Sequence, residues 1–232
     1  MPDVNPTAYL TTLDRFLAHW EDVDAALAPA PLTLSAGYGR ADLQSARAEV
    51  SSKITEGVVA QNQREGLSSD RDRMRRALRA RIVQFRRLVA GLMPGTPFAL
   101  VLPKTPLANA GLGVWERALV ETGGLWADIE SDPPPGVPVP LLVAGGYGLV
   151  DFVADSASLR GVLTALGGAE QDLSRVIFER DRAWKSAHSR LVQYRLAVSA
   201  YFPLSHPLVT SLPRLSAPYR RRKKPSPPPP AE

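Results

Sequence analysis

The chain matches itself at a shift of 109 residues, and this internal repeat constrains its fold more than any other feature. The Gly-Tyr-Gly sequence at 37–39 recurs at 146–148, and the same shift aligns 71–73 with 180–182. The register holds without a gap from 37 to 94, where about a quarter of the positions are identical. Constant register over that distance indicates a duplicated structural unit. The alternative is chance agreement in a chain rich in alanine and arginine.

The similarity extends into a proline-bearing segment, because Leu-Pro-Lys at 102–104 matches Leu-Pro-Arg at 212–214 with one extra residue. Insertions of that kind fall in loops rather than in helices. We therefore predict two helical repeat units, 6–106 and 107–216, which pack together as one body. A tail at 217–232 follows, and its prolines and basic side chains predict disorder.

Apolar residues recur at helical spacing in each unit, which predicts three helices per unit. In the second unit, Gly167-Gly168 predicts a turn between the last two helices, whereas in the first unit a single bent helix is the alternative. We expect an all-α fold in which a tandemly duplicated three-helix unit forms a pseudo-twofold bundle of about six main helices. The expected helices lie near 6–29, 40–58 and 67–93, and near 112–132, 149–166 and 169–202.

An apolar stretch precedes each Gly-Tyr-Gly sequence, and a predicted helix follows it. This layout superficially resembles a glycine-rich phosphate loop, but the spacing of a dinucleotide fingerprint and the Lys-Ser/Thr ending of a P-loop are both missing. We therefore interpret the two sequences as turns in which glycine permits the tight backbone and tyrosine packs beneath it. The residues of the predicted turns are Gly37, Tyr38, Gly39, Gly146, Tyr147 and Gly148.

Charged and amide side chains recur at equivalent positions of both units. Because equivalent positions on either side of a two-fold axis often meet at an interface, these residues are candidate contacts between the repeats or with a partner protein. Independent surface residues inherited from one ancestral unit are the alternative. The candidates are Arg71, Asp72, Arg73, Arg81, Gln84, Arg86, Arg180, Asp181, Arg182, Arg190, Gln193 and Arg195.

Positive charge is unevenly distributed along the chain. The formal net charge is +5, but the tail holds five basic residues against Glu232, so that the residues before it are nearly neutral. Between 60 and 93, nine arginines stand against three acidic residues. A phosphate-tracking surface for nucleic acid is one interpretation of this stretch and the tail, and charge pairing with the acidic first helix is the other. The basic tail residues are Arg220, Arg221, Arg222, Lys223 and Lys224.

The sequence contains no cysteine and three histidines, and it lacks catalytic or metal-binding patterns such as His-Glu-x-x-His and Gly-x-Ser-x-Gly. We therefore expect no cofactor, no metal and no enzymatic activity. The leading hypothesis is a cytoplasmic, non-membrane scaffold or adaptor that binds protein partners, as a homo-oligomer or in a multi-component assembly. The alternatives are weak association with nucleic acid through the arginine-rich helix and tail, and a small anionic ligand or substrate bound between the repeats.

Overall fold

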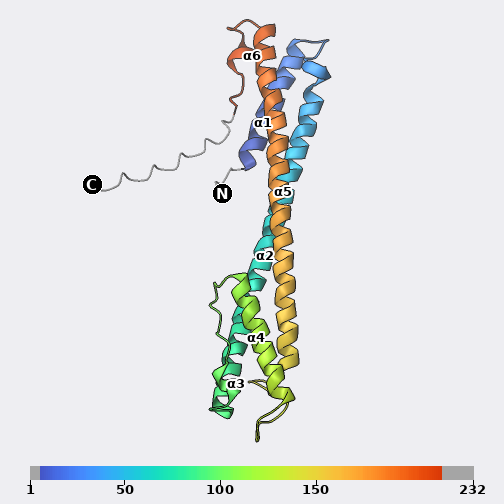
Figure 1. Ribbon diagram of the computed structural model, residues 1–232. Coiled ribbons are helices and arrows are strands. Elements are labelled where there is room, and N and C mark those ends of the chain that lie inside the picture. The colour runs from blue at the N-terminus through green and yellow to red at the C-terminus, as the bar shows by residue number, and fades with distance from the viewer. Residues whose placement is uncertain (1–5, 216–232) are drawn as a thin grey trace, which may run out of the picture. The chain divides into compact units, whose positions relative to one another are not determined.

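The computed structural model describes residues 6–215, which fold into helices joined by loops and one 3₁₀ turn (Figure 1). No β-strand occurs in this range, although an isolated bridge pairs Val143 with Tyr147. The tail predicted at 217–232, with its basic cluster, lies outside the described residues. The elements are α1 (Pro6–Ala26), η1 (Ser35–Gly37), α2 (Arg40–Leu92), α3 (Pro97–Leu100), α4 (Leu112–Ser131), α5 (Leu149–Tyr201) and α6 (Pro207–Thr210).

The two longest helices, α2 and α5, each contain 53 residues and run without interruption. This corrects the prediction of two separate helices in each repeat: the expected turn at Gly167-Gly168 is helical, and 40–58 and 67–93 belong to one helix. The physical reason is that a glycine inside a helix costs only about 1 kcal/mol relative to alanine. Leu166 and Ala169, on either side of the glycine pair, are buried and offset that cost. Each sequence segment thus contains two long helices and one helix of a single turn, rather than three main helices.

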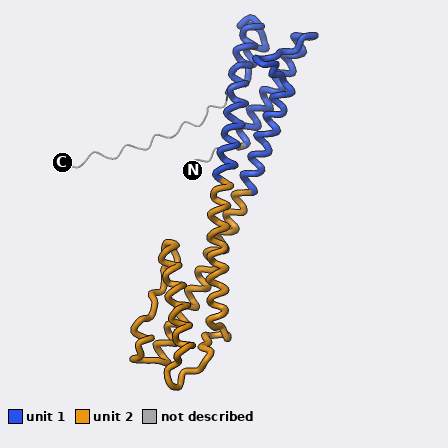
Figure 2. The backbone as a smooth tube through the Cα atoms, turned by 45° about the vertical axis from the view of Figure 1, so that its right-hand side comes forward, with its two compact units in different colours: residues 1–59, 174–232 blue, residues 60–173 orange. Residues whose placement is uncertain are grey.

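The chain divides into two compact units, and each long helix contributes to both (Figure 2). Unit 1 comprises residues 1–59 and 174–232, and unit 2 comprises residues 60–173. Unit 1 therefore contains α1, the first part of α2, the last part of α5, and α6. Unit 2 contains the last part of α2, α3, α4 and the first part of α5. The compact units differ from the sequence segments 6–106 and 107–216, because each unit takes residues from both segments.

The core of unit 1 is built from one face of each of its long helices. Phe16 and Trp20 of α1 and Tyr194 of α5 are fully buried, and the Trp20 ring stacks on Tyr194 with 4.4 Å between the ring centroids. Helix α2 adds Leu43 and Val50 to this cluster. Stacking of this kind adds to the free energy gained by burying two large apolar surfaces.

Unit 2 has a core of similar composition. Trp126 of α4 stacks on Phe85 of α2 with 4.5 Å between the ring centroids, and Phe152 of α5 packs beside them. In each unit, therefore, a tryptophan from the first helix of one sequence segment pairs with an aromatic ring from the long helix of the other segment.

A buried hydrogen-bond chain is built around His19 in unit 1. The Nε2 of His19 donates to the Leu208 carbonyl at 2.8 Å, so Nδ1, which lies 2.7 Å from the Tyr194 hydroxyl, accepts from that hydroxyl. Burial raises the pKa of Tyr194, which keeps the hydroxyl protonated and able to donate. In unit 2, Phe85 occupies the position equivalent to Tyr194 and offers no hydroxyl. This chain of hydrogen bonds fastens α6 to α1.

We predict that Gly167→Ala and Gly168→Ala each raise the free energy of unfolding by about 0.5–1 kcal/mol. Both glycines are exposed and helical, and a methyl group at either position would meet no atom outside its own helix within 4 Å. Urea unfolding followed by far-ultraviolet circular dichroism measures the change. Gly146→Ala is the control, since Gly146 has φ of +73° and alanine there is strained. A loss of stability at Gly167 or Gly168 comparable to that of the control would contradict a continuous α5.

Candidate functional site

The Gly-Tyr-Gly sequence of unit 2 forms a hydrogen-bonded turn that leads into α5. The Val143 N–H donates to the Tyr147 carbonyl at 2.9 Å, and the Gly148 N–H donates to the Asp151 carboxylate at 3.0 Å. Asp151 stands in the first turn of α5, so its carboxylate caps the helix by accepting from a backbone N–H that the helix leaves unpaired. Gly146 has φ of +73°, a conformation that side-chain-bearing residues rarely adopt.

The corresponding turn of unit 1 leads into α2 with the same contacts. The Leu34 N–H donates to the Tyr38 carbonyl at 2.8 Å, and the Gly39 N–H donates to the Asp42 carboxylate at 2.8 Å. Gly37 has φ of +72°. In both turns these hydrogen bonds close the backbone at its ends, and a glycine with positive φ permits the reversal between them.

An arginine of α2 holds the turn of unit 2. The guanidinium of Arg81 lies 4.3 Å from the centroid of the Tyr147 ring. Its Nη1 donates to the Ala144 carbonyl at 2.9 Å and to the Gln84 side chain at 3.0 Å. A planar guanidinium can stack on a ring and donate in its own plane at the same time. Arg81 therefore clamps both the backbone and the tyrosine of this turn.

Arg190 of α5 makes the matching clamp in unit 1. Its guanidinium lies 4.8 Å from the centroid of the Tyr38 ring, and its Nη1 donates to the Ser35 hydroxyl at 3.1 Å and to Gln193 at 2.9 Å. Four predicted contact residues, the two arginines and their glutamines, thus act inside a compact unit. In each case the turn that they hold belongs to the other sequence segment.

Two further predicted residues, Arg86 and Arg195, fasten the Leu-Pro segments to the long helices. Arg86 Nη1 donates to the Thr105 hydroxyl at 3.0 Å, and Arg195 Nη1 donates to the Pro213 carbonyl at 2.9 Å. Leu102 and Leu212 pack against the cores of unit 2 and unit 1, respectively. These segments therefore cover their own units.

The repeated Arg-Asp-Arg triplets lie in different compact units, the first at 71–73 and the second at 180–182. Arg71 donates from Nε to Asp72 at 2.8 Å, and Arg180 donates from Nη2 to Asp181 at 2.7 Å. Each of these pairs joins neighbouring residues on one helix. Arg73 forms an ion pair with Asp70 at 2.9 Å in the same way.

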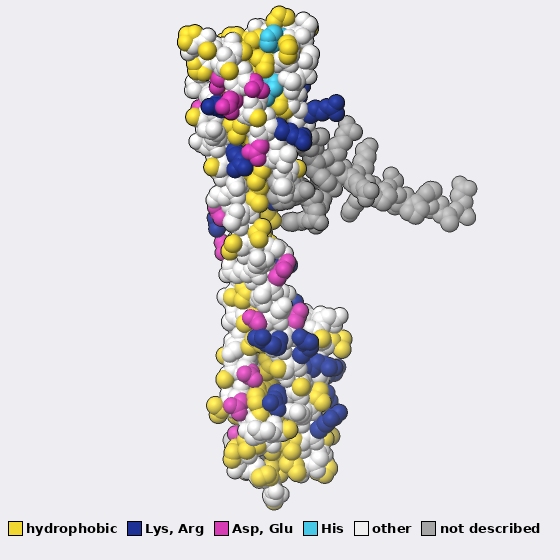
Figure 3. All heavy atoms as spheres, turned by 180° about the vertical axis from the view of Figure 1, so that it is seen from behind, with side chains coloured by type: hydrophobic (Ala, Val, Ile, Leu, Met, Phe, Trp, Pro, Cys, Tyr) yellow, Lys and Arg dark blue, Asp and Glu magenta, His cyan; other side chains and the backbone are white. Residues whose placement is uncertain are grey.

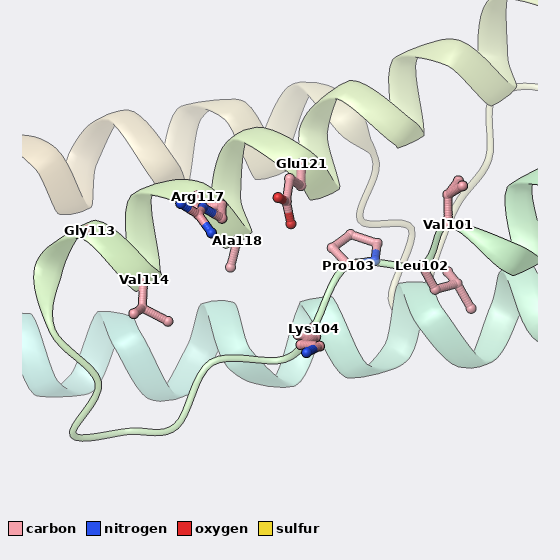
Figure 4. Close-up of a pocket in the computed structure, with 9 residues that line it drawn as sticks. All are labelled: Val101, Leu102, Pro103, Lys104, Gly113, Val114, Arg117, Ala118 and Glu121. Atoms are coloured by element: carbon pink, nitrogen blue, oxygen red, sulfur yellow. The ribbon is translucent and has the colours of Figure 1, made fainter.

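The surface of unit 2 has several hollows that the sequence did not predict, and two of them carry the arguments below. The first, which we call the arginine hollow, has a volume of about 690 Å³ and is lined by Arg71, Asp72, Arg75, Arg76, Ala108 and Asn109. The second, the α4 groove, has a volume of about 520 Å³ and lies between α4 and the extended segment 101–104 (Figure 4). It is lined by Val101, Leu102, Pro103, Lys104, Gly113, Val114, Arg117, Ala118 and Glu121. The basic stretch at 71–76 was visible in the sequence. The loop residues Ala108 and Asn109, and the Trp115 ring beside Arg75, come from elsewhere in the chain.

Arg75 is the least compensated charge of the arginine hollow. Its guanidinium lies 5.5 Å from the centroid of the Trp115 ring. Its Nε and the indole Nε1 of Trp115 are both buried without a hydrogen-bond partner among the described residues. Burial lowers the pKa of Arg75, and the neighbouring charge of Arg71 lowers it further. The hollow is thus bordered by a cation that no acceptor of the described chain satisfies.

Unit 1 has a basic hollow of its own, with a volume of about 640 Å³. Unlike Arg75 in the arginine hollow, Arg190 in this hollow already stacks on Tyr38 and donates to Ser35. Arg182, which was predicted as a contact residue, borders this hollow. The lining residues are Ser35, Arg182, Lys185, Ser186, Ser189, Arg190 and Gln193.

Several kinds of site are not found within residues 6–215. No group of three or more histidine or acidic side chains is placed to hold a metal ion, and no helix combines the length and apolar character needed to cross a bilayer. Comparisons with protein-family models, with curated proteins and with solved structures found no match. Function must therefore be inferred from the residues and contacts of the chain.

We predict that Tyr147→Phe lowers the free energy of unfolding by about 1 kcal/mol, whereas Tyr38→Phe leaves it unchanged or raises it slightly. The Tyr147 hydroxyl donates to Asp155 at 2.9 Å, and burial and then this hydrogen bond raise the pKa of Tyr147. The Tyr38 hydroxyl is buried without a partner, since Ala46 stands at the position equivalent to Asp155. Urea unfolding of the two variants makes the comparison. Both keep the ring under its arginine, so equal losses would refute the assignment of the Asp155 hydrogen bond.

Proposed function

We propose that the protein is a non-catalytic, cytoplasmic helical scaffold that works through protein contacts. In this proposal the chain arose by duplication of one helical unit, and the segments 6–106 and 107–216 are related by an approximate two-fold axis. Two observations support the duplication: α2 and α5 have the same length of 53 residues, and they begin 109 positions apart. The matched turns and arginine clamps at Tyr38 and Tyr147 support it further.

The observation that carries the scaffold proposal is the exposed apolar lining of the α4 groove. Val101 and Val114, on opposite sides of the groove, are 65% and 55% exposed. Pro103 and Ala118 lie between them and form the buried floor of the groove (Figure 4). An apolar patch rimmed by polar residues is typical of a protein-binding surface.

The charges of the groove indicate the chemistry of its partner. Lys104 and Arg117 border the groove together with a single acidic residue, Glu121. Within the described residues, neither Lys104 nor Arg117 forms an ion pair, so both remain available to a partner. We propose that the partner is a protein segment with an apolar side chain that enters the groove and carboxylates beside it. A second copy of the chain is the other outcome that the experiment below resolves.

Nucleic-acid binding along the arginine-rich part of α2 has weaker support. Arg79, Arg81 and Arg86 donate to the Pro106 carbonyl, the Ala144 carbonyl and the Thr105 hydroxyl, all within unit 2. A guanidinium held by such a contact has fewer donors and less freedom left to follow a phosphate backbone. The stretch therefore provides fewer free cations than its composition indicates.

We predict that Val114→Asp weakens partner binding at least about tenfold, because it places a carboxylate in the apolar centre of the contact. A photo-crosslinking amino acid at position 101, which lines the groove and is 65% exposed, is first used in living cells to identify the protein that occupies the groove. The purified pair is then measured by isothermal titration calorimetry with the wild-type chain and the variant.

The matched control is Val153→Asp, because Val153 lies in the same unit, has the same exposure of 55% and does not line the groove. It should change the affinity less than about twofold. Equal weakening by the two variants would refute the groove as the contact surface. If crosslinks form only to a second copy of the chain, the groove is a contact between identical subunits, and the protein is a homo-oligomer rather than an adaptor.

A further inference from the structure

We infer that the arginine hollow of unit 2 binds the phosphoryl group of a small phosphorylated molecule, with Arg75 over Trp115 as the central contact. This inference goes beyond the scaffold proposal and does not depend on it, because the hollow and the α4 groove share no lining residue.

The charge of the hollow comes from one helix face. Arg71, Arg75 and Arg76 all line it, and Arg71 and Arg75 stand four residues apart, where like charges on a helix disfavour each other. Asp72 also lines the hollow, but its carboxylate accepts from Arg71. Within the described residues, neither Arg75 nor Arg76 forms an ion pair with a carboxylate, although Arg76 donates from Nε to the Asp72 carbonyl at 3.3 Å and the charge of Asp72 partly offsets that of Arg75. A bound anion would relieve the repulsion and compensate both charges.

Arg75 is held in place before any ligand arrives. Its guanidinium lies over the Trp115 ring, and its Nε is buried. The electrons of an indole face attract a cation but accept no in-plane hydrogen bond, so the ring orients the guanidinium without using its donors. A fixed guanidinium loses little conformational entropy when it binds the oxygens of a phosphoryl group in two-pronged fashion.

A loop completes the hollow on the side opposite the helix. Arg79 donates from Nε to the Pro106 carbonyl at 3.1 Å and so fixes the loop against α2. Ala108 and Asn109 follow in this loop and line the hollow. The amide of Asn109 adds a neutral donor, a group that suits a phosphoryl oxygen. The lining thus combines three cations, one neutral donor and one carboxylate that is already engaged.

The equivalent place in unit 1 lacks this chemistry. Trp184 occupies the position that corresponds to Arg75, and its ring stacks on Tyr9 with 4.3 Å between the centroids. The same helical position is therefore an apolar packing residue in one unit and an unpaired cation in the other. Packing alone does not require a cation there, as Trp184 shows.

The positions of the unpaired arginines along α2 limit the size of the ligand. Beyond Arg76, the arginines of α2 at 79, 81 and 86 donate to groups of unit 2 itself, and the next arginine without such a contact, Arg87, stands eleven residues further along the helix. Figure 3 shows basic side chains gathered on unit 2, but Arg79, Arg81 and Arg86 are held by contacts within the unit and have fewer donors left to extend the binding surface. A compact ligand such as pyrophosphate or a nucleotide fits this confinement, and an extended nucleic-acid backbone does not.

Pyrophosphate binding, measured by isothermal titration calorimetry on the full chain in phosphate-free buffer, tests the inference. The double variant Arg71→Gln/Arg75→Gln should weaken binding at least about tenfold, because charge-assisted hydrogen bonds are lost. Arg73→Gln/Arg87→Gln removes the same charge from the same helix outside the hollow, and Arg182→Gln/Lys185→Gln removes it from the hollow of unit 1. Both controls should change the affinity less than about twofold.

The tryptophan provides a second measurement that needs no charge variant. Addition of pyrophosphate should shift the indole N–H signal of Trp115, assigned with Trp115→Phe, in a nitrogen-15 correlation spectrum. Adenosine triphosphate should compete for this site, whereas inorganic phosphate should bind more weakly.

Three outcomes would overturn the inference. They are the absence of saturable pyrophosphate binding, equal weakening by either control variant, and a single-stranded oligonucleotide that binds while pyrophosphate neither binds nor competes. Circular dichroism of each variant distinguishes lost binding from lost folding. If the double variant unfolds, the Trp115 signal of the wild-type chain still decides.

Discussion

Two aromatic stacks, Trp20 on Tyr194 and Trp126 on Phe85, are the contacts on which the rest of the fold depends. Each stack joins the first helix of one sequence segment to the long helix of the other segment. Both long helices must therefore carry an apolar face in two places, one for each compact unit. This requirement explains why α2 and α5 continue through their glycines, since an interruption would separate the two halves of a helix that serve different cores.

Arginine performs different tasks in different parts of this chain. Arg81 and Arg190 clamp turns, and Arg86 and Arg195 fasten extended segments. In each case the guanidinium supplies several directed donors and, in the clamps, a planar face for a ring. Arg75 differs because it lies over an indole beside Arg71 and forms no ion pair within the described residues. A stretch rich in arginine is thus not the same as a surface rich in free positive charge.

The sequence predicts the helical class and the turns, because periodicity and Gly-Tyr-Gly are local patterns. It could not predict the continuity of α5, because the effect of Gly167 depends on burial of neighbouring residues that only the folded chain defines. The arginine hollow was missed for a related reason. Arg75 is one of many arginines in the sequence, and its difference arises from Trp115, which lies forty residues away in the chain. The sequence also could not predict the division into compact units, because a repeat does not show that α2 and α5 each contribute to both units.

The shared helices fix the order in which the chain can fold as it is made. Unit 2 draws on residues 60–173, whereas unit 1 combines residues from near both ends of the sequence. The ribosome releases α1 first, yet Tyr194 of α5 emerges only after unit 2 has been synthesised in full. Trp20 and the apolar face around it therefore lack their α5 partners until residues 174–201 have been made. That face is the part of the nascent protein most in need of a chaperone.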